Sequence, residues 1–350
     1  MEHSDRQPSR RDVLGGKLPG GDSVEGTNQE TAEFGPLFHF SSNAMGCQFQ
    51  VLCSADSRQA LANAVSDGFD LIQHLEQHLS IFRDSSELYR VNRHASQQDV
   101  QLDSSLFDLL LLACQMSAVT DGAFDITATP LTQLWKSHRT ERTLPTSLEI
   151  EATLNQVGYR HIHFDASART VRFHNHELKI DLGGIGKGYA LDRLKQYLVA
   201  AGCTDFLIHG GQSSVIGCGQ RSNLEETTKH PWQVSISHPL TPDTQLARLM
   251  ISDRAIGTSG SGRKHFVVEG QRYGHIIDPR TGWPADHLSS VTVVADSAVL
   301  ADALATAIFV AGPEQAQGIC DLFGVAAVLV SNEGMIESKI NLAEEDIRLE

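Results

Sequence analysis

The stretch His275-Ile-Ile-Asp-Pro-Arg-Thr-Gly-Trp-Pro284, together with the segments after it, decides the fold class. It begins as a strand and ends in a sharp loop, because Pro and Gly favour turns. A strand near 291–294 comes next, then helices over 299–310 and 313–323, then strands near 325–330 and 335–339. Strands and helices thus come in runs rather than in strict β-α-β alternation. This order favours an α+β fold with largely antiparallel sheets, flanked by helices, over a Rossmann fold.

Upstream of this stretch, periodicity predicts three helices, and short strands dominate after His161. The helices are expected over 60–79, 106–119 and 187–201, and a strand over 38–54 is interrupted at Met45-Gly46. Strands are expected over 162–164, 171–173 and 178–181, and near 204–209, 213–218, 232–237, 247–251, 264–269 and 272–277. The length allows one large domain or two intimate ones, and we place this folded part over 36–340. A disordered polar tail (1–35) and a C-terminal tail (341–350) are expected to flank it.

Composition excludes several classes of partner. The 350 residues carry a net charge of −15, with 41% hydrophobic and 20% charged residues. Nucleic-acid binding needs clustered Lys and Arg, so this class is disfavoured, as is an anionic lipid surface. An anionic small molecule remains possible, but its negative charge would have to be balanced at the binding site by a metal ion or by backbone amides. No stretch approaches the ~20 apolar residues of a membrane span. The six cysteines form no CxxC pair, which disfavours a zinc or redox motif.

The start of the chain bears on its compartment. Ser9-Arg-Arg-Asp-Val-Leu14 resembles a twin-arginine export signal, but Gly15-Gly-Lys-Leu-Pro-Gly-Gly21 comes next instead of an apolar region. As the sequence stands we expect a cytoplasmic protein. A periplasmic or cell-envelope location is the alternative, if this start is a degraded or wrongly assigned export signal.

Asp302 and Thr306 lie in the run Ala301-Asp-Ala-Leu-Ala-Thr-Ala307 and share one face of an otherwise apolar helix. A lone buried carboxylate is costly unless it is paired or bound to a metal. Carboxylate and hydroxyl oxygens are hard ligands suited to Mg²⁺. The alternative is structural, with Asp302 bonding free backbone amides near the helix start and Thr306 bonding back to its own helix.

The glycine-rich run Lys179-Ile-Asp-Leu-Gly-Gly-Ile-Gly-Lys-Gly-Tyr189 leads from a strand into a helix. Glycines let the backbone approach a ligand, and the helix start offers amides and a partial positive charge for phosphate. The run is neither a Walker A loop nor a GxGxxG fingerprint. The alternative is structural: the run is a plain strand-to-helix turn, and Lys187 is a solvated charge.

Three further features have simpler structural explanations. Backbone groups of Ala123, Phe124 and Asp125 are placed to face a ring or a ribose, but the segment also reads as a helix-to-helix connection. Gly210-Gly211 is explained by a tight hairpin turn. The HxH spacings His161/His163 and His174/His176 are commoner on hairpin surfaces than at metal sites.

In this order, these segments resemble the ApbE-type FAD:protein FMN transferase (flavinyltransferase) family. The resemblance extends from about Phe38 to about Val330. The matching runs are Met45-Gly46, 80–92 with Ser86-Glu87-Leu88 and Asn92, 122–125, 181–189, Gly210-Gly211, 257–260, 275–282 and 301–306. The resemblance implies a T-fold-like α+β architecture with a flavin cleft between two sub-domains.

The family's reaction moves FMN from FAD to a Ser or Thr hydroxyl of an acceptor flavoprotein, forming a phosphoester and releasing AMP. Carried over, Asp302 and Thr306 would ligate Mg²⁺, with the backbone carbonyl near Gly184 completing the site. The acceptor would be a flavoprotein subunit of an electron-transfer complex. The resemblance places nine residues at the FAD pocket: Met45, Phe82, Asn92, Ala123, Phe124, Asp125, Asp181, Lys187 and Ile276.

The general base is open between two residues. His275 is the first candidate, because an unperturbed imidazole titrates near neutrality. Asp278 is the alternative base or orients His275. Amides of the 183–188 turn are expected to hold the diphosphate. Two positions depart from the family pattern, Gln212 after the glycine pair and Ser261 where an aromatic residue often lies. An FAD pyrophosphatase, which yields FMN and AMP, and a non-catalytic flavin-binding or trafficking protein are the competing functions.

Overall fold

The computed structural model describes residues 37–54, 58–222, 228–261 and 265–350. The predicted polar tail and the twin-arginine-like start lie outside these residues. An eight-stranded sheet forms the centre, in the order β1-β2-β6-β7-β12-β15-β16-β17, and every neighbouring pair is antiparallel. The strands are β1 (Phe38–Ala44), β2 (Cys47–Cys53), β6 (Phe206–Gly210), β7 (Ser214–Cys218), β12 (Arg254–Gly260), β15 (Ser290–Ala295), β16 (Ala326–Val330) and β17 (Ile336–Ile340).

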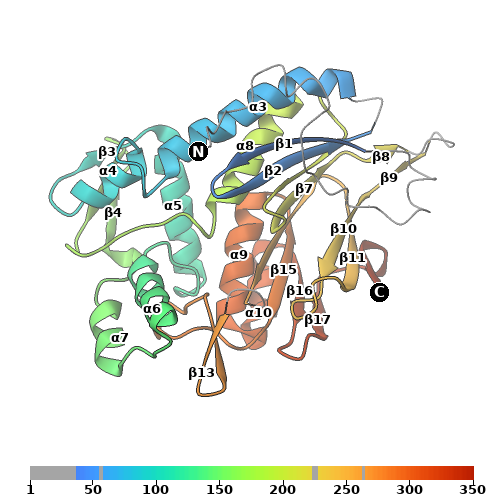
Figure 1. Ribbon diagram of the computed structural model, residues 1–350. Coiled ribbons are helices and arrows are strands. Elements are labelled where there is room, and N and C mark those ends of the chain that lie inside the picture. The colour runs from blue at the N-terminus through green and yellow to red at the C-terminus, as the bar shows by residue number, and fades with distance from the viewer. Residues whose placement is uncertain (1–36, 55–57, 223–227, 262–264) are drawn as a thin grey trace, which may run out of the picture.

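Four helices pack on one face of this sheet (Figure 1). They are α3 (Arg58–Leu79), α8 (Gly186–Ala200), α9 (Ala298–Ala311) and α10 (Pro313–Phe323). Helix α9 is buried nearly all round and crosses β7, β12 and β15. Its start is capped twice, since Ser297 accepts from the amide of Leu300 and the Asp192 carboxylate of α8 accepts from the amides of Ala298 and Val299. Burial raises the pKa of Asp192.

The opposite face is covered by a small sheet of β10 (Trp232–Ser237), β11 (Gln245–Ile251) and β18 (Ile347–Leu349). Ile347 is only 7% exposed and belongs to the core between the two sheets, with Trp232 and Leu249. We predicted a C-terminal tail over 341–350, but its last residues instead pair with β11 and fill this core. A three-residue strand is too short to be recognised by alternation.

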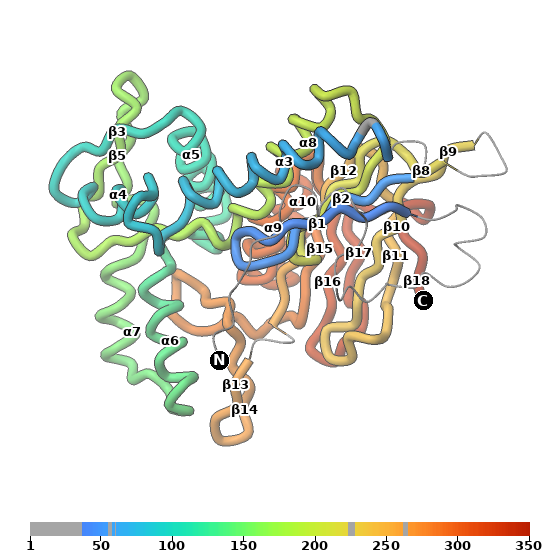
Figure 2. The backbone as a smooth tube through the Cα atoms, turned by 45° about the horizontal axis from the view of Figure 1, so that its top comes forward, coloured from blue at the N-terminus to red at the C-terminus, as the bar shows by residue number. Residues whose placement is uncertain are grey.

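Residues 80–182 form a mostly helical lobe beside the sheet (Figures 1 and 2). It contains α4 (Glu87–His94), α5 (Ser104–Val119), α6 (Thr129–Glu141), α7 (Ser147–Leu154), the short helix η2 (Tyr159–His161) and the sheet of β3 (Val100–Gln101), β4 (Ile162–Asp165) and β5 (Thr170–Phe173). One hydrophobic cluster runs from α4 and α5 into α9, β15 and β16. The two parts thus share one core. The strand predicted over 178–181 is wrong, because the segment pairs with no strand among the described residues.

A protruding hairpin of β13 (His265–Val268) and β14 (Gln271–Gly274) leads into the 275–285 loop (Figure 2). Trp135 of α6 lies 5.7 Å from the ring of Tyr273 and 5.4 Å from that of Trp283. Its Nε1 donates to the carbonyl of Gly282 at 2.7 Å. These contacts join the helical lobe to the loop. The remaining short elements are β8 (Arg221–Ser222), β9 (Lys229–His230) and η3 (Glu344–Asp346).

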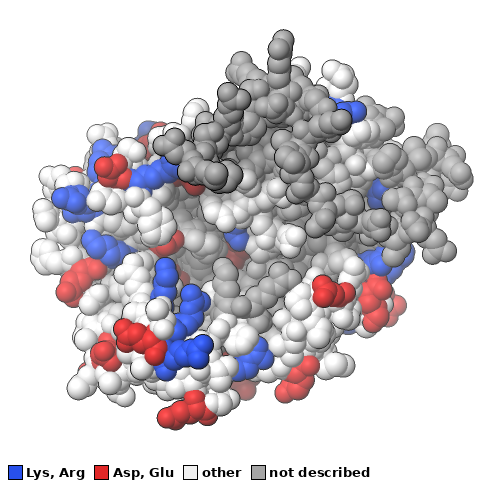
Figure 3. All heavy atoms as spheres, viewed as in Figure 1, with Lys and Arg blue, Asp and Glu red and all other residues white. Residues whose placement is uncertain are grey.

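The described surface carries charges of both signs. On the face seen in Figure 3, several basic side chains gather in the lower left centre, and acidic side chains lie around them among the described residues. All six cysteines are free. Of the helices in the described part of the chain, none has the length and apolar character needed to cross a membrane.

Candidate active site

The site is built where α9 crosses the adjacent strands β7 and β12. Ser214 and Gly257 are partners in this strand pair and face α9 together. A Cβ atom on Gly257 would lie 2.4 Å from the carbonyl carbon of Ala301 and 2.5 Å from the amide nitrogen of Asp302. The absent side chain therefore lets the helix backbone lie directly on the strand. This close approach brings the carboxylate of Asp302 within reach of Ser214.

Asp302 is 8% exposed and accepts hydrogen bonds from two groups. The Ser214 hydroxyl lies 2.7 Å from Oδ1 and 2.9 Å from Oδ2, and the amide of Gly188 donates to Oδ2 at 2.8 Å. Burial raises the pKa of Asp302 to about 6, although Lys187 and these hydrogen bonds oppose the shift. Asp302 is therefore a desolvated carboxylate that a nearby cation would stabilise in its ionised form.

Thr306 lies one turn further along α9. Its hydroxyl is 2.9 Å from that of Ser259, the next β12 residue that faces the helix, and it donates to the carbonyl of Asp302 at 3.3 Å. A Cβ atom on Gly184 would lie 4.0 Å from Thr306 Oγ1 and 3.3 Å from the ring of Phe124. The structure thus brings together Gly184, Asp302 and Thr306, the three predicted metal-binding residues.

The glycine turn before α8 is held partly by its own contacts. The amide of Gly183 donates to the Asp181 carboxylate at 2.6 Å, and the amides of Ile185 and Gly186 donate to the carbonyl of Leu182. With the Gly188 amide on Asp302, four amides of the turn already have partners within the protein. We predicted that the amides of the 183–188 turn hold a diphosphate, but these four are instead engaged within the protein.

Gly188 and Lys187 connect this turn to α9 and β7. A Cβ atom on Gly188 would lie 2.2 Å from the carbonyl oxygen of Ala298, so α8 and α9 meet here without a side chain between them. Lys187 is half-buried and donates from Nζ to the hydroxyl of Ser213. Lys187 is therefore not the solvated charge of the structural alternative.

Asn92 of α4 anchors the chain just before the turn. Its Nδ2 donates to the carbonyl of Ile180 at 2.9 Å, and its Oδ1 accepts from the amide of Ile180 at 2.8 Å. The side chain thus takes the place of a neighbouring strand. Asp181 is held next to it, because its amide donates to the carbonyl of Ile126 at 2.8 Å. Asn92 positions the segment that carries Asp181 rather than standing free in a cleft.

Residues 123–127 form a tightly bonded connection under the turn. Ala123 and Phe124 are buried. Asp125 accepts from the amide and hydroxyl of Thr127 and from the amide of Tyr159. Burial raises the pKa of Asp125, and these bonds oppose it. The side chain of Asp125 therefore holds the loop in shape, as the structural alternative for this segment expects.

The 275–285 loop is closed by backbone contacts and by an ion pair. Ile277 bridges to Pro284, and the amide of Ala285 donates to the carbonyl of Ile276. The buried Asp278 accepts from Arg280 three times, at Oδ1 from the amide and from Nε, and at Oδ2 from Nη2 at 2.8 Å. Both oxygens of this carboxylate are thus engaged by Arg280. This geometry favours a loop-anchoring role for Asp278 over that of a base.

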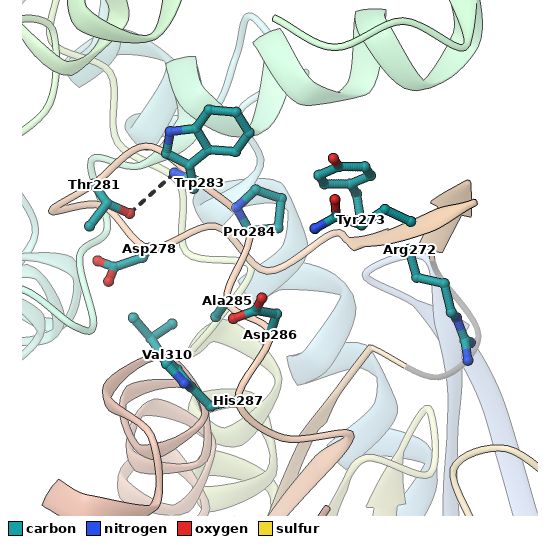
Figure 4. A pocket seen from close by; sticks show the side chains of 11 residues that line it. Arg272, Tyr273, Asp278, Thr281, Trp283, Pro284, Ala285, Asp286, His287 and Val310 are labelled. Carbon is teal, nitrogen blue, oxygen red and sulfur yellow. Dashed lines mark hydrogen bonds between the residues drawn. The ribbon is translucent and has the colours of Figure 1, made fainter. Parts of the chain in front are cut away.

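A pocket of about 580 Å³ lies under this loop (Figure 4). Val310 contributes to its wall, and Asp302, Thr306 and Val310 lie at successive turns of α9. Val310 is thus the residue of α9 through which this pocket adjoins the helix. Its lining residues are Gln271, Arg272, Tyr273, Asp278, Thr281, Trp283, Pro284, Ala285, Asp286, His287 and Val310.

Met45 and Phe82 lie on other segments. Met45 is half-buried in the β1–β2 turn with a φ of 50°, beside a second hollow of about 410 Å³. Phe82 is 88% exposed in the segment before α4. Gln212, one of the departures from the family pattern, is exposed in the β6–β7 turn with a φ of 66°, and Ser261 donates its amide to the carbonyl of Ser289.

Sequence reasoning did not single out Ser213, Ser214 or Arg280 as site residues. Ser214 comes after Gly210-Gly211 in a segment interpreted as a plain hairpin. The alternation of β7 was the available signal, since it places a polar Ser214 on the same face as Ile216 and Cys218. A polar residue on a core face requires a partner, and that partner is Asp302.

In this antiparallel α+β fold, a buried carboxylate and a hydroxyl lie beside a glycine turn, which is an arrangement of hard oxygen ligands suited to a cation. Residues 45–329 match the model of the ApbE family. The chain is 32% identical over 263 residues to the FAD:protein FMN transferase of Salmonella typhimurium strain LT2, covering 73% of each chain, and 31% identical over 272 residues to that of Escherichia coli K12, covering 74% of each. The chain belongs to the ApbE family.

Solved structures agree with this assignment. The ApbE protein of Thermotoga maritima superposes with a TM-score of 0.77 at 29% identity, covering 87% of this chain and 97% of that one. The apo form of the Pseudomonas stutzeri flavinyl transferase ApbE gives 0.73 at 27% identity, with coverage of 87% and 95%. The predicted family, the enzyme class and the α+β ApbE fold are thereby confirmed.

Proposed function

We propose that this protein transfers FMN from FAD to a Ser or Thr hydroxyl of an acceptor flavoprotein and releases AMP, with Mg²⁺ bound at Asp302, Thr306 and the carbonyl of Gly184. The observation that carries the proposal is the meeting of these three residues beside a glycine turn, in a chain of the ApbE family. The relatives' name, FAD:protein FMN transferase, supports the substrate and the reaction class.

The donor set suits magnesium. Carboxylate, hydroxyl and carbonyl oxygens are hard ligands, and Mg²⁺ is usually held by one or two carboxylates together with substrate phosphates. Within the described ranges, His, Cys, Asp and Glu do not gather in threes as a metal site, which fits a cation that relies on the substrate for part of its shell. When bound, Mg²⁺ supplies charge neutralisation at the pyrophosphate.

The chain's own residues would perform the remaining steps. The acceptor hydroxyl oxygen forms a bond to the FMN-side phosphorus, and the bond from that phosphorus to the bridging oxygen breaks. AMP leaves with the bridging oxygen. His275 is the proposed base that takes the hydroxyl proton, since Asp278 is engaged by Arg280. Lys187, near Asp302, would contact a phosphate. Val310, one turn of α9 beyond Thr306, lines the pocket in Figure 4, and a bound FAD at the metal ligands would extend toward this pocket.

The test is an incubation of the full chain with FAD, Mg²⁺ and a flavoprotein acceptor, followed by intact-mass measurement. An FMN adduct on the acceptor, absent when the acceptor Ser or Thr is replaced by Ala, is expected. Free FMN with AMP would instead establish a pyrophosphatase, and unaltered FAD a binding protein. Asp302→Ala serves as the matched variant and is expected to stay soluble and lose transfer. Transfer by this variant with unchanged Mg²⁺ dependence would refute the metal assignment.

A further inference from the structure

We infer that Ser214 is a positioning residue that holds Asp302 ready for a divalent cation. This inference rests on the proposed function and concerns the affinity of the same site. Ser214 is fully buried, and its hydroxyl lies within hydrogen-bond distance of both carboxylate oxygens, at 2.7 and 2.9 Å. A hydroxyl placed between the two oxygens restrains rotation of the carboxylate about its Cβ–Cγ bond.

The register of the sheet explains why this residue can do so. Ser214 faces Gly257 across the β7–β12 pair, and Gly257 has no side chain between the strand and the helix. The backbone of α9 can therefore come close enough for a side chain as short as serine to reach Asp302. Ser213, one residue earlier, lies in the turn before β7, and its hydroxyl accepts from Lys187 instead.

The two hydrogen-bond donors leave part of the Asp302 carboxylate available to a cation. An ionised carboxylate offers about four lone-pair sites. The amide of Gly188, from α8, donates to Oδ2. The hydroxyl of Ser214, from β7, lies within hydrogen-bond distance of both oxygens. The hydroxyl of Thr306 lies one helical turn further on the same face of α9, toward Gly184. The lone pairs of Asp302 that these two donors leave unoccupied are available to a cation.

Groups that orient a metal ligand without touching the metal typically change metal affinity about 10- to 100-fold when they are removed. We therefore expect Ser214→Ala to weaken Mn²⁺ binding, measured by titration in the presence of FAD, by about 10- to 100-fold. FAD affinity without metal is expected to be unchanged, because Ser214 is fully buried. A purely structural role would instead lower the melting temperature and both affinities together.

Two further variants make the measurement decisive. Ser214→Cys keeps the size of the side chain but offers a weak donor, so it is expected to lose metal affinity even if the alanine variant folds poorly. Ser290→Ala is the matched control, because Ser290 is a buried serine of the same sheet whose hydroxyl meets no hydrogen-bond partner among the described residues. Its metal affinity is expected to equal that of the wild type.

The inference is overturned if Ser214→Ala and Ser214→Cys bind Mn²⁺ as tightly as the Ser290→Ala control. That result would leave the proposed function intact, provided that wild-type protein still transfers FMN in a metal-dependent way. If wild-type protein binds no Mn²⁺ in the presence of FAD, the magnesium site itself is refuted, and this inference with it.

Discussion

Replacing Gly257 by alanine tests whether the contact between β12 and α9 sets the geometry of the site. The new methyl group would lie 2.4 Å from the carbonyl carbon of Ala301, and 2.5 Å from that residue's oxygen and from the amide nitrogen of Asp302. All three atoms belong to the helix backbone, so no side-chain rotation relieves the overlap. Helix α9 would have to move away by about 1 Å to restore ordinary van der Waals distances.

Such overpacking typically lowers the free energy of unfolding by about 1–3 kcal/mol. A displacement of about 1 Å at a catalytic group can cost about 100-fold in rate. We therefore expect Gly257→Ala to lose both stability, measured by urea unfolding, and FMN transfer, measured by intact mass. Gly318→Ala is the control, since Gly318 lies within α10 and no described atom comes within 4 Å of the added methyl. It should gain up to about 1 kcal/mol. Wild-type stability and transfer in Gly257→Ala would refute the reasoning.

Two further predictions concern protons. His275→Ala is expected to slow FMN transfer while FAD and Mn²⁺ affinities stay at wild-type values; an unchanged transfer rate would remove His275 from the proton path. For the metal-free protein, burial raises the folded-state pKa of Asp302 to about 6, above the unfolded value of about 4. Protonated Asp302 therefore makes its full contribution to the free energy of unfolding below about pH 4, and this contribution is lost as the pH rises to about 6. Asp302→Asn should lack this loss of about 3 kcal/mol between pH 4 and 7 in urea unfolding, and equal pH slopes for the two proteins would contradict the assignment.

Regular apolar patterns made several elements predictable. Helix α9 was expected over 299–310 and extends over Ala298–Ala311, because almost every residue in it is apolar. Helices α3, α5, α8 and α10 were likewise placed to within a few residues. Such helices are recognised from sequence because their burial leaves a long, continuous signal.

The elements that were missed carry weak or mixed signals. Helix α6 buries only Leu131 and Trp135, while α7 buries only Ile150. Both nevertheless had start signals, a proline at the first turn of α6 and a capping box from Thr146 to Glu149 in α7. Strand β12 contains two glycines and small polar residues, which are poor strand formers. It is a strand because β7 and β15 pair with it on both sides.

For the site, the sequence by itself determined which groups were available. The carboxylate and hydroxyl of Asp302 and Thr306 share a helix face because they are four residues apart, and the glycines before α8 are set by their order in the chain. These are local relations, and local geometry is encoded by spacing.

Only the tertiary structure decided what those groups contact. The partners of Asp302 are Gly188 and Ser214, which are 114 and 88 residues away, and Asn92 holds Ile180 across 88 residues. Such pairs depend on strand register and on how closely a helix lies on a sheet. Here the register places Ser214 opposite Gly257, and because Gly257 has no side chain, the backbone of α9 packs directly against β12. No spacing within one segment of the sequence specifies that distance.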